Sequence, residues 1–474
     1  MPDNRGSWRF IAMVSLAIAA PMPIGCEAGD DLSVGSAAAK GGGCGNGRCG
    51  RGESCATCPS DCGGCTADGG SVADSGAPDT GAPDTGAADA GSADAGSDSG
   101  PAPCTPGSIA CNIDVRPVSV GSLTVGTSKI YAAPLDTGGL VTTWVGSDAA
   151  IHVTQLDATG ARTAPDFSVP GQAVHGLAVV PDGYAMLIRT SFQMSFVKVS
   201  TSGAVLLERV LVAGCVGGMS TGLGALPSAT GRLLWTGTRY LAYFEIVSMT
   251  STCGLSHSQD IIFYLEADAS PVPPADTWPQ WPNGCSHSLD QEIDISGTSV
   301  AKVCLSDCFP SKAILYFSRG GSNTVLSPEP SGDCLGTSSA SLGSLVPVSD
   351  GFWVSYTSRE GRASSDVGLI HMSLTGTPDS QIWLTGTASA DETGTHLARY
   401  QGGLLAGWAV SGVYYLARLD SAGSMTGAPE VVSVQFAGTA GAQRNNFFNY
   451  SNGDAGWVWA WGSMNELKVV RVRN

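Results

Sequence analysis

The sequence of 474 residues predicts an all-β protein whose largest part is a β-propeller of seven four-stranded blades. Beyond residue 104, short runs of β-branched and aromatic residues come in seven pairs that are broken by Gly, Ser and Pro. The second run of each pair starts at residue 151 in the first unit and at 467 in the seventh, about 53 residues per unit, which is close to the length of propeller repeats. Helical periodicity is scarce over the same region.

Each unit is expected to supply four strands. Turn sequences such as DATG at 157–160 and SLTG at 373–376 follow several second runs, and a further apolar run follows those turns. The units carry no Trp-Asp signature and no regular Kelch-type Gly-Gly pattern, so they match no named propeller family. Six blades, or a pair of β-sandwiches, are the alternative architectures. The seven pairs of runs span residues 140–157, 184–200, 240–267, 300–319, 352–373, 404–420 and 456–473.

One strand at the start of this region has no partner near it in sequence. The run DVRPVSV at 114–120 precedes the first unit, whereas the seventh unit stops at Asn474 after only three strands. We therefore predict that residues 114–120 form the outer strand of the blade that contains Trp457, Trp459 and Trp461. Pairing the two ends in this way closes a ring and removes exposed sheet edges.

Residues 1–25 are typical of an export signal. Two arginines precede an apolar run at 10–20, which is shorter than the ~20 residues that span a bilayer. The Gly-Cys pair that ends at Cys26 resembles the lipobox of bacterial lipoproteins, which implies that a lipid on Cys26 anchors the chain in a membrane. The chain has 15 Cys, and lipidation of Cys26 leaves an even number for pairing. Cleavage after Ala19 or Ala20, which gives a secreted protein, is the alternative.

A Cys-rich module occupies residues 44–65. Its two C-x-x-C motifs are only three residues apart, whereas zinc ribbons separate theirs by about 15–20 residues. In an oxidising compartment we therefore predict three disulfides, with Ca²⁺ binding by Asn46, Glu53 and Asp61 as a minor alternative. The pattern CGNGxCxxGESCxxCPxDCG resembles a module of exported lipoproteins from gram-negative soil bacteria, which implies a spacer or interaction role. The six cysteines are Cys44, Cys49, Cys55, Cys58, Cys62 and Cys65.

A linker is predicted at residues 66–103, which contain no Lys, Arg or aromatic residue and repeat Asp every five residues from Asp74 to Asp94. Such a tract cannot bury enough apolar surface to offset the entropy of ordering, so we expect disorder. The chain then consists of the signal peptide, a lipid-anchored lead segment at 26–43, the Cys-rich module, the linker and a propeller domain at 104–474. This order predicts a protein held at the outer membrane or cell surface of a gram-negative bacterium.

Candidate ligand contacts are few. The net charge of −17 and the sparse basic residues disfavour nucleic acid as a partner. Trp278 and Trp281 lie in a Pro-rich insertion, where exposed indole rings would stack on a sugar or hold a peptide. Asp290, Glu292 and Asp294 alternate along one strand face, which we expect to be solvated. A Ca²⁺ site or a pair of sugar-cleaving carboxylates is the alternative there.

Neither a catalytic residue nor a metal site is predicted, and no cofactor is expected. The six His are scattered, and no pair has the i, i+4 spacing of metal ligands on a helix. We therefore predict a monomeric, non-catalytic surface lipoprotein whose propeller binds a protein or glycan ligand. The alternative is an enzyme that acts on extracellular polysaccharide at the central channel, because propellers host both roles.

Overall fold

A computed structural model describes most of the chain beyond residue 106. Residues 1–106 lie outside the described part, and with them the predicted signal peptide, Cys26, the Cys-rich module and the linker, which stay predictions. All the described residues belong to one compact unit, Ser97–Asn474. The described residues are 107–121, 130–190, 193–213, 215–216, 219–221, 231–249, 257–272, 284–309, 313–317, 323–328, 339–386, 389–434, 447–460 and 465–474.

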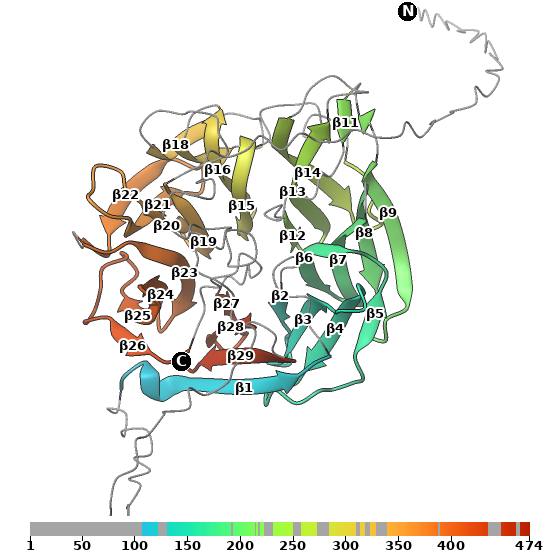
Figure 1. Cartoon of the computed structure of the whole chain (residues 1–474), viewed down its shortest axis with the longest axis horizontal. Coiled ribbons are helices and arrows are strands. Elements are labelled where there is room, and N and C mark those ends of the chain that lie inside the picture. The colour runs from blue at the N-terminus through green and yellow to red at the C-terminus, as the bar shows by residue number, and fades with distance from the viewer. Residues whose placement is uncertain are drawn as a thin grey trace, which may run out of the picture. The chain divides into compact units, whose positions relative to one another are not determined.

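Seven blades with a four-stranded antiparallel plan form a ring (Figure 1), which confirms the predicted fold. Five blades are separate sheets. Blades 1 and 2 contain β2 (Tyr131–Pro134), β3 (Leu140–Val145), β4 (Ile151–Leu156) and β5 (Phe167–Val169), then β6 (Ala173–Val180), β7 (Gly183–Thr190), β8 (Gln193–Val199) and β9 (Val205–Ala213). Blades 5 and 6 contain β19 (Ser341–Val348), β20 (Gly351–Ser358), β21 (Asp366–Ser373) and β22 (Pro378–Trp383), then β23 (Glu392–Tyr400), β24 (Gly403–Val410), β25 (Val413–Leu419) and β26 (Glu430–Val432).

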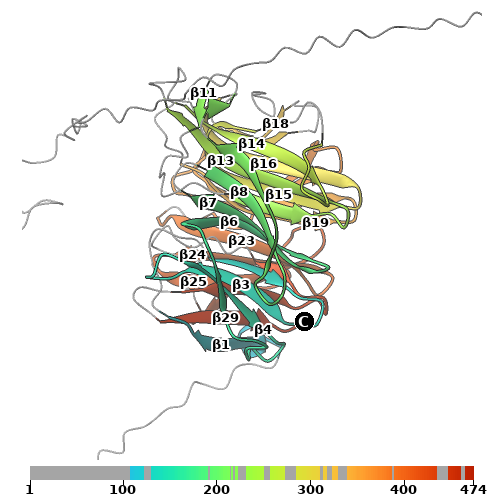
Figure 2. The same cartoon turned by 90° about the vertical axis from the view of Figure 1, so that its right-hand side faces the viewer.

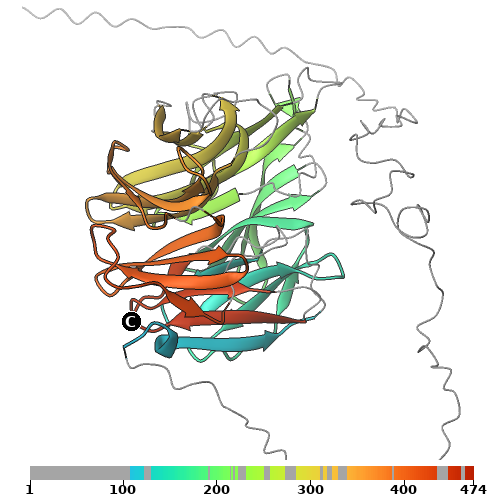
Figure 3. The same cartoon turned by 60° about the vertical axis from the view of Figure 1, so that its left-hand side comes forward.

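Blade 7 closes the ring with the two ends of the domain, as the sequence predicts. It consists of β27 (Phe448–Asn449), β28 (Ala455–Trp459), β29 (Glu466–Val472) and, as its outer strand, β1 (Ile113–Ser119). The ladder between β1 and β29 runs without interruption from the Ile113–Val472 pair to the Ser119–Glu466 pair. Figure 3 shows the blue β1 lying against the red β29. A short 3₁₀ helix, η1 (Ala110–Asn112), leads into β1.

Blades 3 and 4 are joined in one nine-stranded sheet. They contain β12 (Gly231–Trp235), β13 (Arg239–Met249) and β14 (His257–Glu266), then β15 (Ser286–Ser296), β16 (Ser299–Phe309), β17 (Ala313–Phe317) and β18 (Asn323–Pro328). The strands β13 to β16 are unusually long and lie next to one another in Figure 2. Their extensions allow β14 to pair with β15 at Gln259 and Ser286, and a small hairpin of β10 (Cys215–Val216) and β11 (Met219–Thr221) adds to β13.

The turn that follows β14 in blade 3 has the same form as in two other blades. A bridge between Leu265 and Pro271 corresponds to the bridges Leu156–Arg162 in blade 1 and Leu419–Met425 in blade 6. In those two blades the outer strand begins a few residues after the bridge. In blade 3 the equivalent segment falls outside the described residues.

Apolar side chains fill the spaces between neighbouring blades, because successive residues of a strand point to opposite faces of its sheet. In β14, Ile261 and Phe263 pack toward blade 2, whereas Ile262 and Tyr264 pack toward blade 4. Large clusters of this kind lie between most neighbouring blades. Blades 3 and 4 are the exception among the described residues, because small apolar clusters there accompany buried polar groups such as Gln291 and Lys302.

A disulfide joins Cys285 to Cys304 and links the start of β15 to the middle of β16. Both residues are fully buried between blades 3 and 4. Cys111, beside the closing strand, is also disulfide-bonded. The sequence placed four cysteines around this unit but could not choose among their connectivities.

Candidate functional site

The first strands of the seven blades line the centre of the ring, and each contacts the first strands of its two neighbours. Strands alternate in direction within a blade, and each blade has a plan of four strands, so every blade begins in the same direction. The inner strands therefore all end at the same end of the ring. The turns from first to second strand and from third to fourth strand also lie at that end. We call it the closure face, since Ile113 enters the blade 7 ladder there opposite Val472.

A buried ion pair crosses the channel wall between blades 3 and 4. The Arg232 guanidinium on β12 donates to both oxygens of Glu292 on β15, with Nε–Oε2 at 2.7 Å and Nη2–Oε1 at 2.5 Å. Burial alone would lower the pKa of Arg232, but the charge and hydrogen bonds of Glu292 outweigh it and raise the pKa. The expectation of a solvated strand face at Asp290, Glu292 and Asp294 is therefore wrong for Glu292, which is 2% exposed. An arginine on the neighbouring blade allows this carboxylate to be buried.

Asp294 lies nearer the closure face on the same inner strand. Burial raises its pKa to about 7, the negative charge of Glu292 adds to that effect, and the Ile295 amide and the Arg399 guanidinium oppose it. A carboxyl of this kind is partly protonated at neutral pH. A group with such a pKa is suited to proton transfer.

A cavity of about 820 Å³ opens on the closure face where blades 5, 6 and 7 meet. Polar groups, mainly hydroxyls and amides, make up about half of its walls, and the lining extends to the turns that follow β19, β23 and β27. The rings of Tyr400 and Tyr450 border it but are themselves buried. The polar side chains are Ser349, Ser421, Ser451, Gln401, Asn449 and Asn474.

Asn449 holds the wall between blades 6 and 7. Its Oδ1 accepts a hydrogen bond from the Arg399 amide at 3.1 Å, and its Nδ2 donates to the Arg399 carbonyl at 2.6 Å. One side chain therefore takes the place of a strand partner for β23. Two more hydrogen bonds hold this boundary between blades 6 and 7, which we call the seam. The Tyr400 hydroxyl donates to the Arg473 carbonyl at 2.7 Å, and the Gln401 amide donates to Asn474 Oδ1 at 3.0 Å.

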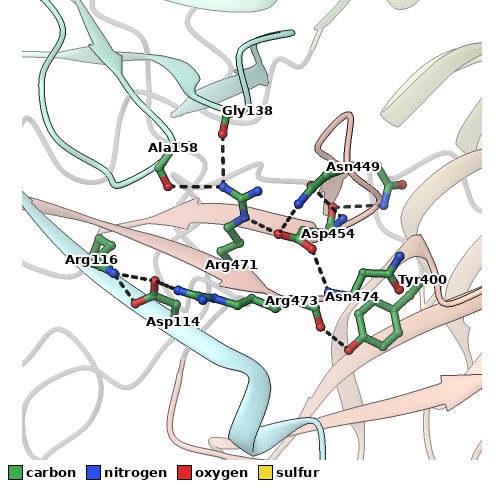
Figure 4. Close-up of polar contacts among 11 residues, drawn as sticks. Asp114, Arg116, Gly138, Ala158, Tyr400, Asn449, Asp454, Arg471, Arg473 and Asn474 are labelled. Atoms are coloured by element: carbon green, nitrogen blue, oxygen red, sulfur yellow. Dashed lines mark hydrogen bonds and ion pairs between the residues drawn. The ribbon is translucent and has the colours of Figure 1, made fainter.

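Asp454 organises the polar contacts at the far side of the seam (Figure 4). Its carboxylate accepts from Arg471 Nε at 2.5 Å and from the Asn474 amide at 2.8 Å. Arg471 also donates to the Gly138 carbonyl of blade 1 at 3.2 Å and stacks on the Tyr450 ring. Although burial opposes it, the hydrogen bonds from Asn474, Asn452 and Arg471 hold the pKa of Asp454 below its usual value.

Two charged side chains face the cavity from different blades. Arg399 reaches it from β23, and Asp350 reaches it from the turn between β19 and β20. Asp350 already lies 3.7 Å from Nε2 of His371, whose Nδ1 is 2.6 Å from Asp379. Arg399 forms no ion pair with any described residue.

Two other places in the described part of the chain are weaker candidates for binding. A hollow of about 480 Å³ on blade 5 is bordered by Arg362, whose guanidinium lies 3.9 Å from the Trp383 ring centre and is already paired with Asp366. Asp260 lies with Cys285 and Cys304 at metal-ligand distances, but both sulfurs are in a disulfide, so no thiolate is available to a metal.

The residues predicted to contact a ligand, Trp278 and Trp281, lie outside the described residues. Sequence analysis missed Arg399 and Asn449. A signal for the first was present, since Arg399, Tyr400 and Gln401 are polar or amphipathic residues that end a strand just before a Gly-Gly turn. No helix in the described part of the chain is long and apolar enough to cross a membrane.

No protein-family model matches the chain, and no curated protein matches it. The ring with its closing strand defines a β-propeller protein by its own sheets. Similar solved structures include the propeller of Dos1, at 13% identity and a TM-score of 0.41, covering 74% of this chain and 79% of that one. The BP39L lectin from Burkholderia pseudomallei matches at 11% identity and a TM-score of 0.42, covering 72% and 98%. A prolyl endopeptidase matches at 13% identity and a TM-score of 0.43, and the match covers 70% of this chain but only 46% of that one. Similarity at this level assigns no function.

Proposed function

We propose that this protein is a non-catalytic, lipid-anchored surface protein whose propeller binds a ligand in the closure-face cavity. The observation that carries the binding site is the cavity itself. It is large enough for a drug-sized ligand or a short oligomer, and convergent hydroxyl, amide and charged groups line it. The export signal, the lipobox-like Cys26 and the linker support the surface location.

The position of the cavity agrees with a binding role. Its walls come from three blades, and hydrogen bonds of Asn449, Tyr400 and Asn474 fix the walls from blades 6 and 7 relative to each other. A site that is already organised loses less conformational entropy when a ligand binds. Propeller rings commonly use an end face in this way, but the fold alone does not choose the ligand.

Blocking the cavity tests the proposal. The exposed Ser421 lies in the turn that follows β25, so Ser421→Trp should fill the cavity without disturbing the core. The matched control is Thr201→Trp, at the equivalent turn position of blade 2 and outside the cavity. A screen of the full-length protein against glycan and peptide arrays should give ligands whose binding is lost with the first variant and kept with the second. Ligands that bind both variants equally would place the binding site elsewhere.

Asp294 supports a second candidate, an enzyme that cleaves polysaccharide in the channel. Its pKa of about 7 is the kind of value that a general acid needs, and Glu292 lies two residues away on the same strand. Glu292, however, is held by Arg232 in an ion pair, which leaves no free second carboxylate there. Release of reducing ends from a bound polysaccharide, abolished by Asp294→Asn, would favour the enzyme over the binding protein.

A further inference from the structure

We infer that the ligand of the closure-face cavity is a saccharide that carries a carboxylate, and that Arg399 binds this carboxylate. The inference rests on the proposed binding function and adds the chemical class of the ligand. Three features of the cavity lead to it: the missing partner of Arg399, the fixed position of its backbone, and the nature of the walls.

The guanidinium of Arg399 has no ion-pair partner among the described residues, as is also the case for Arg209 and Arg418, but of these three only Arg399 lines the cavity. Eight other described arginines each form an ion pair with Asp or Glu, at positions 116, 162, 232, 239, 359, 362, 471 and 473. Arg399 is exposed at the cavity, and no described residue forms an ion pair or hydrogen bond with its guanidinium.

The carboxyls around this site do not neutralise Arg399. Its charge acts on Asp294, but that carboxyl is partly protonated near neutral pH because burial raises its pKa to about 7. Asp350, across the cavity on blade 5, lies beside His371 rather than beside Arg399. The guanidinium is therefore not fully neutralised and still attracts an anion that enters the cavity.

The backbone of Arg399 is fixed before any ligand arrives. Asn449 hydrogen-bonds both the amide and the carbonyl of Arg399, at 3.1 and 2.6 Å. Only the side-chain rotamers remain to be ordered when a carboxylate binds. A planar guanidinium can then donate two parallel hydrogen bonds to the two carboxylate oxygens.

The walls favour a saccharide over a peptide as the carrier of the anion. Hydroxyls of Ser349, Ser421 and Ser451 and amides of Gln401 and Asn474 surround the cavity. Such groups match the closely spaced hydroxyls of a sugar, whereas peptide recognition generally uses apolar pockets or a sheet edge. The bordering Tyr400 and Tyr450 are 3% and 5% exposed, so they offer little apolar surface to a peptide side chain.

Calorimetric titration of the full-length protein with an oligogalacturonate tests the inference. The same oligomer with its carboxylates methyl-esterified is the matched neutral probe, and an oligoglutamate is the acidic peptide probe. We expect the oligogalacturonate to bind, and we expect methyl esterification or Arg399→Gln to weaken binding by about tenfold or more, since each removes a charged hydrogen-bond partner. Arg399→Lys should keep part of the affinity. Arg359→Gln, at an exposed arginine outside the cavity, should change nothing.

Each other outcome has a definite meaning, provided that the variants melt like the natural protein. Equal binding of the ester and the acid, lost with Ser421→Trp, would overturn the carboxylate and leave the proposed binding site in place. Binding that survives Ser421→Trp would overturn both. Failure of the oligogalacturonate to bind, or tighter binding of the oligoglutamate, would overturn the acidic saccharide as the ligand class.

Discussion

Two boundaries of the ring are sealed by different means. Between blades 3 and 4, a shared sheet and a buried ion pair join the two blades, and a disulfide within blade 4 ties β15 to β16 beside that boundary. Between blades 6, 7 and 1, the two ends of the domain meet as β1 and β29, and side chains such as Asn449 and Asp454 bridge the remaining gaps. The first boundary is closed by paired strands and an ion pair, whereas the second is held by hydrogen bonds and opens into the cavity on the closure face.

The difference shows where such a ring can accommodate a ligand. A boundary that is filled by long, paired strands leaves no room at the end face. At the seam, β27 is only two residues long, so it cannot pair along the whole of β28, and polar side chains take over. Those side chains define walls without filling the space between them. The site lies beside this short ladder, because unpaired backbone there must be satisfied by side chains or by a ligand.

Removing the closing strand should have the largest effect on the stability of either boundary. Deletion of residues 104–120 takes away β1 together with Ile109, Val118 and Val120, which are buried at the seam. At about 1.5–3 kcal/mol for each buried side chain, the loss is on the order of 5 kcal/mol and exposes the edge of β29. Thermal unfolding followed by circular dichroism should show a much lower melting temperature, and light scattering should show aggregation.

The control for that deletion removes the predicted linker. Deletion of residues 66–103 should leave the melting temperature unchanged, because a solvated segment contributes no packing. If deletion of 104–120 melted like the intact protein, the ladder between β1 and β29 would not be what closes the ring in solution.

Breaking the buried ion pair of Arg232 and Glu292 should destabilise the boundary between blades 3 and 4 nearly as much. Glu292→Gln leaves the Arg232 guanidinium buried with no carboxylate, and losing one partner of a buried pair costs about 3–5 kcal/mol. Urea unfolding should show a lower midpoint. The double variant Arg232→Met, Glu292→Leu should recover most of the loss, since an apolar pair needs no charge compensation. A double variant as unstable as the single one would mean that the pair does more than neutralise its own charges.

Removing the disulfide should have an intermediate effect. Cys285 and Cys304 are separated by 19 residues, and closing a loop of this size stabilises a protein by about 3 kcal/mol. The variant in which both become Ala should melt several degrees lower than the natural protein. Reductant should lower the melting temperature of the natural protein in the same direction once the chain is partly unfolded. An unchanged melting temperature would mean that the ladder between β15 and β16 holds these strands of blade 4 together without the disulfide.

The sequence predicted the ring because blade repeats are local. Paired runs such as 352–373 become β20 and β21. The unpartnered run at 114–120 becomes β1, whose bounds lie one residue earlier than predicted. Local patterns could not predict the fusion of blades 3 and 4, because the long strands β13 to β16 resemble ordinary strands joined to polar loops. Which strand neighbours which across a blade boundary depends on the closed ring rather than on any run of residues.

The site was harder to predict for the same reason. Glu292 lies in a strand pattern that is typical of a solvated face, and only the neighbouring blade shows that Arg232 neutralises it. Arg399 and Asn449 are fifty residues apart in sequence, yet they meet at the seam. Single-sequence analysis favoured aromatic residues at 278 and 281 because they are conspicuous without any tertiary context.

The smallest predicted effect is the pH dependence of the stability that Asp454 contributes to the seam. Hydrogen bonds hold the pKa of Asp454 below its ordinary value of 3.8, so the folded state favours the ionised form. The stabilisation is present above pH 3.8 and is lost as the pH falls through the lower pKa of the folded state.

Asp454→Asn should therefore lower the melting temperature at pH 7 by an amount that corresponds to about 1–2 kcal/mol, because it weakens the contacts with Arg471 and Asn474. The gap between the two proteins should narrow in melts below pH 3.8, where the natural carboxylate begins to take up a proton. Asp136→Asn, at an exposed position on the same face, should show neither effect. A gap that stayed constant with pH would show that Asp454 acts through its shape and hydrogen bonds rather than through its charge.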